Sequence, residues 1–203
     1  MFWAGGCGSC HAEKSAKGDA KKLLGGGHRL DTPAGVFVTP NISPDPETGI
    51  GNWSLEDFAN AMWNGVSPGG RHYYPSFPYA SYIRMTGEDI SDLFAFLKTL
   101  EPVSRANEPH ELPLPLKLHR GIGLWKLAFL KDGPVMDGIG DDEALQRGRY
   151  LVEGPGHCGE CHTPRTAFGF GGMDKSRWLG GGAAPLGDGM IPNITPQDKG
   201  LGG

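Results

Sequence analysis

All four cysteines of the chain lie in two copies of one five-residue pattern that has a specific chemistry. C-x-x-C-H attaches a c-type haem: the two thiols add across the haem vinyl groups, and the histidine becomes an axial ligand of the iron. With 7 histidines in 203 residues, chance would place one after both pairs only about once in 1000 cases. The sequence therefore predicts two covalently attached haems, at Cys7, Cys10 and His11 and at Cys158, Cys161 and His162.

Paired cysteines have other uses, which we weigh against haem attachment. Two C-x-x-C pairs can form a structural zinc site, but such pairs lie roughly 15–20 residues apart. Here Cys158 follows Cys7 by 151 residues. A redox dithiol needs a βαβ context that neither pattern has, and it does not explain the histidine. Structural disulfides stay open, because four cysteines are an even number.

The composition predicts a loop-rich chain with short helices. It includes 34 glycines and 17 prolines, and only 38% of the 203 residues are hydrophobic. This length corresponds to one or two domains, whose small cores a flat apolar cofactor bonded to the chain would help to close. The net charge of −4 and the pI near 6 indicate no nucleic-acid partner.

No stretch of the sequence predicts a membrane span or a signal peptide. The most apolar stretch, residues 112–130, is interrupted by prolines, lysines, His119 and Arg120. Because haem is attached covalently outside the cytoplasm, we expect a leader upstream of this chain.

The chain repeats itself with a period near 150 residues, which predicts two tandem domains. Besides the haem patterns, a Leu-Gly-Gly-Gly segment, a Pro-Asn-Ile-(Ser/Thr)-Pro segment and a Gly-(Ile/Leu)-Gly segment each occur twice. The pairs are residues 24–27 and 179–182, 40–44 and 192–196, and 49–51 and 200–202. We expect a first domain over 1–105, a Pro-rich linker over 106–140 and a second domain over 141–203. The apolar run 124–130 of the linker is expected to pack between the domains.

Helices are the elements predicted around these motifs, so the expected fold class is all-α. Ser54 begins a helix with one apolar face that ends at Gly65, and Thr86 begins another that ends before Pro102. A third helix is predicted over residues 141–152, with acidic residues in its first turn.

The two copies of the repeat differ in extent. A helix is expected before the second haem pattern, whereas only residues 1–6 precede the first, and the second copy stops before the position that corresponds to Trp53. We therefore expect a fragment of a longer protein, with the first helix of the first domain largely absent and the second domain incomplete.

The second axial ligand of the first iron decides what that haem does. A methionine sulfur raises the reduction potential and closes the iron to small ligands, which suits electron transfer. Met85 ends an irregular segment rich in proline and tyrosine, residues 71–84, and such a rigid loop can hold a thioether against iron. We predict Met85 as the ligand, with His72 as the competing candidate and Met62 as a core residue on a helix face.

The second iron has no assigned sixth ligand within this chain. Met173 and Met190 follow His162 at short intervals, and Met190 aligns near Val38, which is not a ligand. By the repeat, we expect the ligand beyond residue 203.

Several longer motifs accompany the haem patterns: PNISPD (40–45) running into GIGNWS (49–54), YPSFPY (74–79) before Met85, and EGPGH (153–157) before the second haem pattern. With these motifs, nearly the whole chain resembles the diheme cytochromes c related to the cytochrome c subunits of membrane-bound bacterial alcohol and gluconate dehydrogenases. The resemblance implies all-α cytochrome c domains. It also implies a periplasmic or membrane-attached electron carrier between a dehydrogenase and a quinone or terminal oxidase.

The resemblance carries further implications for single residues. It suggests that Asn41 and Trp53 lie near the first haem and bond a propionate; the alternatives are that Asn41 caps a turn and that Trp53 is ordinary core. Gly148 and Tyr150 resemble the element through which the first helix of a domain crosses its last helix. Because larger relatives carry a third haem, a diheme and a triheme parent both stay open, as does membrane association through a segment outside this chain or a partner subunit.

Outer-sphere electron transfer is the function that we predict, with no nucleic-acid partner and with redox proteins as partners. The alternative from another class is an enzyme, a diheme peroxidase, which also carries two distant C-x-x-C-H patterns. A thiosulfate dehydrogenase with cysteine ligation is disfavoured, because no cysteine is left over.

Overall fold

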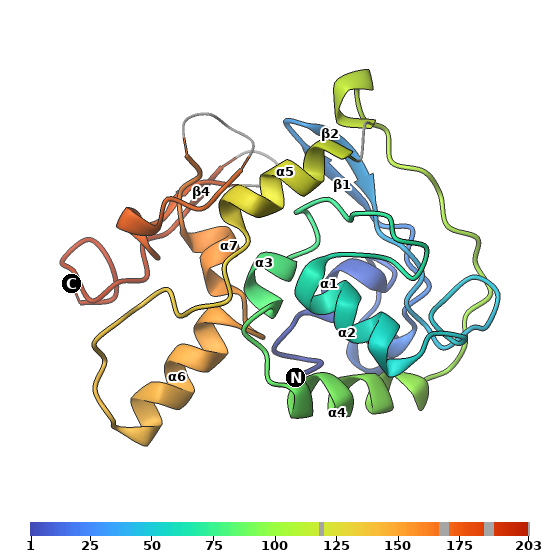
Figure 1. The fold of residues 1–203 in the computed structure, drawn as a ribbon, viewed down its shortest axis with the longest axis horizontal. Helices are drawn as coiled ribbons and strands as arrows, with labels where there is room; N and C mark the ends of the chain where they lie inside the picture. The colour runs from blue at the N-terminus through green and yellow to red at the C-terminus, as the bar shows by residue number, and fades with distance from the viewer. Residues whose placement is uncertain (118–119, 167–170, 185–188, 203) are drawn as a thin grey trace.

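Short helices joined by long loops make up most of the structure, a computed structural model that describes residues 1–117, 120–166, 171–184 and 189–202 (Figure 1). Within these residues the α-helices are α1 (Cys7–His11), α2 (Leu55–Asn64), α3 (Tyr79–Tyr82), α4 (Gly87–Lys98), α5 (Arg120–Phe129), α6 (Glu143–Glu153) and α7 (Cys158–His162). Three short 3-10 helices are η1 (Gly18–Lys22), η2 (Leu114–Lys117) and η3 (Lys175–Arg177). The loop-rich, mostly helical architecture is the one expected from the composition.

Two small antiparallel hairpins are a difference from the all-α expectation. Strands β1 (Arg29–Thr32) and β2 (Gly35–Val38) pair in the register Arg29 with Val38, and β3 (Gly182–Ala183) pairs with β4 (Met190–Ile191). The first hairpin forms because Gly35, at φ 119°, permits the turn and the following Val-Phe-Val run favours extended backbone. The second occupies the matching place in the repeat, so the hairpins are part of each copy.

The main core lies in the first copy of the repeat (residues 1–105), where α2 and α4 pack together. Both helices begin as the sequence predicts: the Ser54 hydroxyl accepts from the Asp57 N–H in a full capping box, and Thr86 caps α4. The rings of Phe58 and Phe94 stack at 5.0 Å across the two helices. The buried members of this core are Phe2, Leu24, Ile50, Phe58, Met62, Tyr82, Met85, Ile90, Leu93 and Leu97.

The helix α5 packs between the two copies, as predicted for the apolar run 124–130. Figure 1 shows it between the blue-to-green first copy and the orange-to-red second copy (residues 141–203). Trp125 lies edge-on to Tyr79 of the first copy at 6.1 Å. On the other side, Phe129 lies so close to Gly172 that a Cβ there would be 2.2 Å from the ring. The linker helix is therefore fixed to both copies.

A buried lysine ties α5 to the end of α2. The Nζ of Lys126 donates to the carbonyls of Asn64 and Gly65, the latter at 2.7 Å, lies 2.9 Å from Nδ1 of His72, and sits over the Tyr79 ring. Burial lowers the pKa of Lys126 to about 8, so the amine is still charged at neutral pH. The ammonium thus satisfies carbonyls that the end of a helix leaves without intrahelical donors.

The helix α6 contacts the first copy through Tyr150. The Tyr150 hydroxyl donates to the carboxylate of Asp89 and accepts from the N–H of Thr86 at 3.2 Å, both at the start of α4. The family resemblance implies that Gly148 and Tyr150 pack against the last helix of their own domain. In the structure, the Tyr150 hydroxyl instead contacts the start of α4, which is the last helix of the first copy.

None of the helices formed by the described residues has the length and hydrophobicity of a membrane span.

We expect Lys126→Met to lower the free energy of unfolding by about 1–3 kcal/mol, because buried carbonyls lose their donor while the aliphatic volume is kept. Denaturant unfolding of the haem-loaded chain measures the change. The matched control is Lys131→Met, an exposed lysine just beyond the same helix, which should change stability by no more than about 0.5 kcal/mol. Equal effects of the two substitutions would contradict this role of Lys126.

Candidate haem-attachment sites

The two C-x-x-C-H patterns form matching one-turn helices, α1 and α7. Each follows a residue in the left-handed region: Gly6 at φ 60° and His157 at φ 39°. The glycine after each first cysteine is buried against a neighbour. A Cβ on Gly8 would lie 2.5 Å from the Lys21 carbonyl oxygen, and a Cβ on Gly159 would lie 2.1 Å from the Trp178 ring. The inner face of both helices therefore has no room for a side chain.

Each histidine of the patterns makes the same hydrogen bond to a proline carbonyl. The His11 Nδ1 lies 2.8 Å from the Pro40 oxygen, and the His162 Nδ1 lies 2.9 Å from the Pro192 oxygen. Because a carbonyl only accepts, Nδ1 carries the proton and Nε2 keeps a free lone pair, the form that ligates a metal. Burial also lowers the pKa of His11, which favours the neutral imidazole.

Two backbone hydrogen bonds near each histidine of the haem patterns occur in both copies. In the first copy, the N–H of Gly26 donates to the His11 carbonyl at 2.8 Å; in the second, the N–H of Gly181 donates to the His162 carbonyl at 2.7 Å. The N–H of Ile42 donates to the Leu24 carbonyl and the N–H of Ile194 donates to the Leu179 carbonyl, both at 3.0 Å. The repeat that the sequence shows is thus also a structural repeat.

The repeated glycine-rich segment has a steric reason. Gly26 (φ 70°) and Gly181 (φ 73°) occupy the left-handed region. A Cβ on Gly26 would lie 2.4 Å from the Pro40 carbonyl, the group that bonds His11, and a Cβ on Gly181 would lie 2.8 Å from the carbonyl carbon of Pro192. Only glycine lets the chain pass this close to the acceptor of each histidine.

The four cysteines, all of which lie in the described residues, are free thiols without a disulfide. Burial raises the pKa of Cys7 to about 11; burial and, secondarily, the nearby Cys161 raise the pKa of Cys10. Redox dithiols instead have lowered thiol pKa values. Among the described residues, no group of three or more His, Cys, Asp or Glu side chains could hold a metal ion. The donor set and the matching surroundings fit covalent haem, and His11 and His162 stay the predicted iron ligands.

Met85 lies beside the first attachment segment. Its side chain is buried and lines a small cavity together with Cys7, Met62 and Leu93. The indole N–H of Trp63 donates to the Met85 carbonyl at 3.0 Å and holds the backbone there. His72, the competing candidate, lies instead against α5, where its ring is 3.5 Å from the Cβ position of Gly123. The ligand role of Met85 stays a prediction, which this placement favours.

Trp63 and Tyr82 are site residues that sequence reasoning missed. Trp63 directly follows Met62 on α2, and a helical pattern alone assigns it to the core. Tyr82 belongs to the same buried cluster as Met85 and donates from its hydroxyl to the Gly5 carbonyl at 3.1 Å. Its position in the YPSFPY-to-Met85 segment was the available signal.

Asn41 has the second of the two roles that the sequence left open. Its Oδ1 accepts from the Ser43 N–H at 2.9 Å, which closes a turn, and its Nδ2 donates to the carbonyl of Val103 at 2.6 Å and to the hydroxyl of Thr48 at 3.0 Å. Both amide hydrogens are thereby used within the protein, and a bond from Asn41 to a propionate stays a prediction. Trp53 packs half-buried against the main core, and its link to a propionate stays a prediction.

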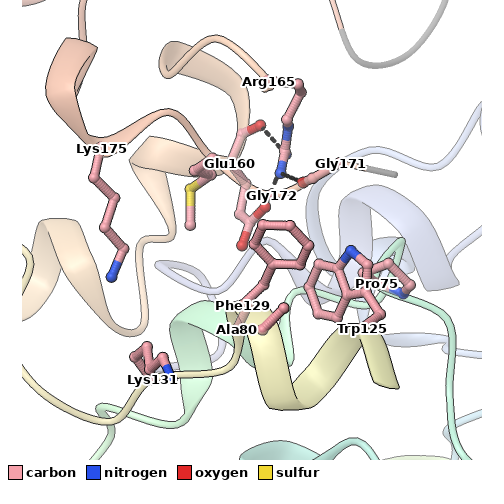
Figure 2. A pocket seen from close by; sticks show the side chains of 12 residues that line it. Pro75, Ala80, Trp125, Phe129, Lys131, Glu160, Arg165, Gly171, Gly172 and Lys175 are labelled. Atoms are coloured by element: carbon pink, nitrogen blue, oxygen red, sulfur yellow. Dashed lines mark hydrogen bonds and ion pairs between the residues drawn. The ribbon is translucent and has the colours of Figure 1, made fainter. Parts of the chain in front are cut away.

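The two methionines of the second copy lie in different surroundings. Met190 forms β4 opposite Ala183 and is 77% exposed. Met173 lines a cavity of about 340 Å³ between α5 and the second copy (Figure 2). Figure 2 shows Trp125 and Phe129 on one side of this cavity and the Glu160–Arg165 ion pair, 2.9 Å, on the other. The sixth ligand of the second iron stays unassigned.

Comparison with known proteins gives consistent matches. Residues 1–101 match the cytochrome c family. The chain is 55% identical over 199 residues to a "Diheme cytochrome c-type" protein of Cereibacter sphaeroides, covering 97% of this chain and 65% of that protein. It is 37% identical to the cytochrome c subunit of the quinone alcohol dehydrogenase of Gluconobacter oxydans, with 97% and 41% covered. For the gluconate 2-dehydrogenase cytochrome c subunit of Pantoea cypripedii the identity is 36%, with 98% and 46% covered. The chain thus spans just under two thirds of the first relative and less than half of the other two.

We expect Gly26→Ala to loosen the bond between Pro40 and His11, since the new Cβ strikes the carbonyl as well as straining the backbone. The free energy of unfolding should fall by about 3 kcal/mol or more. Gly70→Ala is the matched control: φ is 77° there, but nothing lies within 4 Å of the Cβ position, so it should lose only about 1–2 kcal/mol of backbone strain. Thermal unfolding gives both values, and the low-spin ferric spectrum reports the histidine. A spectrum altered equally by both substitutions would count against the steric argument.

Proposed function

Because residues 1–101 belong to the cytochrome c family and the whole chain is related to diheme cytochromes c, we propose that this protein transfers electrons through two haems c, the first held by His11 and Met85. Haem iron supplies one-electron redox chemistry when it is bound. The observation that carries the proposal is that Cys7 of the first haem pattern and Met85 line one cavity, while the bond of His11 Nδ1 to Pro40 leaves its Nε2 free to ligate iron.

The residues around Met85 do what an electron-transfer site needs. The thioether raises the reduction potential and, together with apolar Met62 and Leu93, keeps water and small ligands away. The bond from Trp63 holds the Met85 backbone, so little rearrangement accompanies a change of charge. On this proposal the chain's own part is ligation, burial and positioning.

The domain organisation that we propose follows the repeat: a first domain over 1–105, a linker over 106–140 and a second domain over 141–203. The duplicated hydrogen bonds of the two histidines support it. Since related proteins are named as cytochrome subunits of alcohol, fructose and gluconate dehydrogenases, the proposed electron donor is a dehydrogenase. A quinone or a terminal oxidase is the proposed acceptor, and the periplasm or the periplasmic face of the inner membrane the place.

We expect Met85→Ala to open the first iron to carbon monoxide and to lower its potential, while the haem stays attached through the two thioethers. Carbon monoxide binding to the reduced chain is the measurement. Met62→Ala is the control from the same cavity wall; it should destabilise the fold by about 2–5 kcal/mol without added binding. Carbon monoxide binding gained only in Met62→Ala would make Met62 the ligand, and no gain in either variant would point to His72.

A carrier and the peroxidase alternative differ in one assay. The haem-loaded chain, with its closed first site, should oxidise a reduced dye with peroxide no faster than free haem c peptide does. Appreciable peroxide turnover that survives in the chain with Met85 intact would refute the carrier proposal and establish an enzyme.

A further inference from the structure

The segment 153–157, which precedes the second haem pattern, reaches the cavity beside Cys7 and Met85. Pro155 is less than 2% exposed and lines the same cavity as Cys7, Met62 and Met85. Its carbonyl oxygen lies 3.6 Å from the Cβ position of Gly5. The wall of the first site is therefore completed by a residue that belongs to the second copy.

His157 connects the same segment to the turn that precedes Cys7. Its Nε2 lies 3.2 Å from the carbonyl oxygen of Gly5, and because a carbonyl only accepts, Nε2 donates. The Tyr82 hydroxyl donates to this same carbonyl at 3.1 Å, and the two rings meet edge-on at 5.6 Å. The Gly5 carbonyl, two residues before Cys7, thus accepts hydrogen bonds from a residue of each copy.

Glu153 connects the other end of the segment to Arg84, the residue before Met85. Its buried carboxylate accepts from the N–H groups of Val135 and Met136, both at 2.8 Å, and lies 3.9 Å from the guanidinium of Arg84, also buried. Arg84 directly precedes Met85 in the chain. The segment therefore contacts both stretches that flank the first haem, at Gly5 and at Arg84.

The backbone at His157 shows that this contact has a cost. Gly6, the corresponding residue of the first copy, occupies the left-handed region at φ 60° without penalty, whereas His157 occupies it at φ 39° with a side chain. A strained residue of this kind persists where surrounding contacts hold it, and such positions gather at functional sites. Here the contacts are those with Gly5 and Tyr82.

We propose that the segment 153–157 is part of the first haem site: Pro155 closes its wall, while His157 and Glu153 set the spacing of the segments that carry Cys7 and Met85. The second copy then controls how far solvent reaches the first haem, and so its potential. This rests on the proposed function, in which Met85 is the ligand. His157 acts as a positioning residue, because it reaches the haem site through Gly5.

The test is His157→Gly in the full chain with both haems attached. Glycine relieves the strain at φ 39°, so the chain should fold with unchanged or higher thermal stability. Loss of the bond to Gly5 should nevertheless speed hydrogen exchange at the amides of Gly5, Gly6 and Ser9 about fivefold. The midpoint potential of the first haem should fall as solvent gains access. Unchanged exchange or an unchanged potential would overturn the proposal.

Tyr150→Phe is the matched control, because it removes two hydrogen bonds between the copies, with Thr86 and Asp89, and leaves the contact at Gly5 intact. It should leave the exchange at the amides of Gly5, Gly6 and Ser9 unchanged; an increase equal to that of His157→Gly would overturn the special role of the segment. Carbon monoxide binding by Met85→Ala separates this from the proposed function. If Met85→Ala gains no carbon monoxide binding while His157→Gly speeds exchange, Met85 is not the iron ligand but the role of the hydrogen bond from His157 to Gly5 stands.

Discussion

The hydrogen bond from each histidine of the C-x-x-C-H patterns to a proline carbonyl is the constraint on which both haem sites depend. The distance from Nδ1 to the carbonyl oxygen is 2.8 Å for His11 and 2.9 Å for His162, and the bond fixes the tautomer that leaves Nε2 free to ligate a metal. The carbonyl of a proline is the acceptor in both copies, and Gly26 or Gly181 passes beside it where no side chain fits. The glycine and proline motifs therefore repeat because they build this one acceptor twice.

Local features of the fold could be predicted from the sequence because their causes are local. The caps at Ser54 and Thr86 are read from adjacent residues and lie where they were expected. The hairpins were missed, since strands of two to four residues leave almost no alternating pattern to read. The haem patterns were recognisable because covalent attachment needs its three residues side by side in the chain.

Contacts between distant segments left no signal that one sequence could show. The Gly148 and Tyr150 pattern predicts a contact with another helix, but nothing in the sequence shows that this helix is α4. Asn41 fitted a propionate ligand and a turn cap equally well, and only the structure shows that its amide donates to Val103 and Thr48. Such pairings are set by how the copies pack, which depends on shape more than on residue type.

The buried pair of Glu153 and Arg84 shows how the packing between the copies is made specific. Removing two charges from water costs free energy, which an ion pair at 3.9 Å does not by itself offset. Here each partner is also bonded to backbone: the carboxylate to two N–H groups, the guanidinium to the carbonyls of Ala80, Lys131 and Gly133. An arrangement of linker and copies that kept these charges buried without those bonds would be strongly disfavoured. The network therefore favours the observed arrangement, in which Pro155 of the second copy lines a cavity with Cys7 and Met85 of the first.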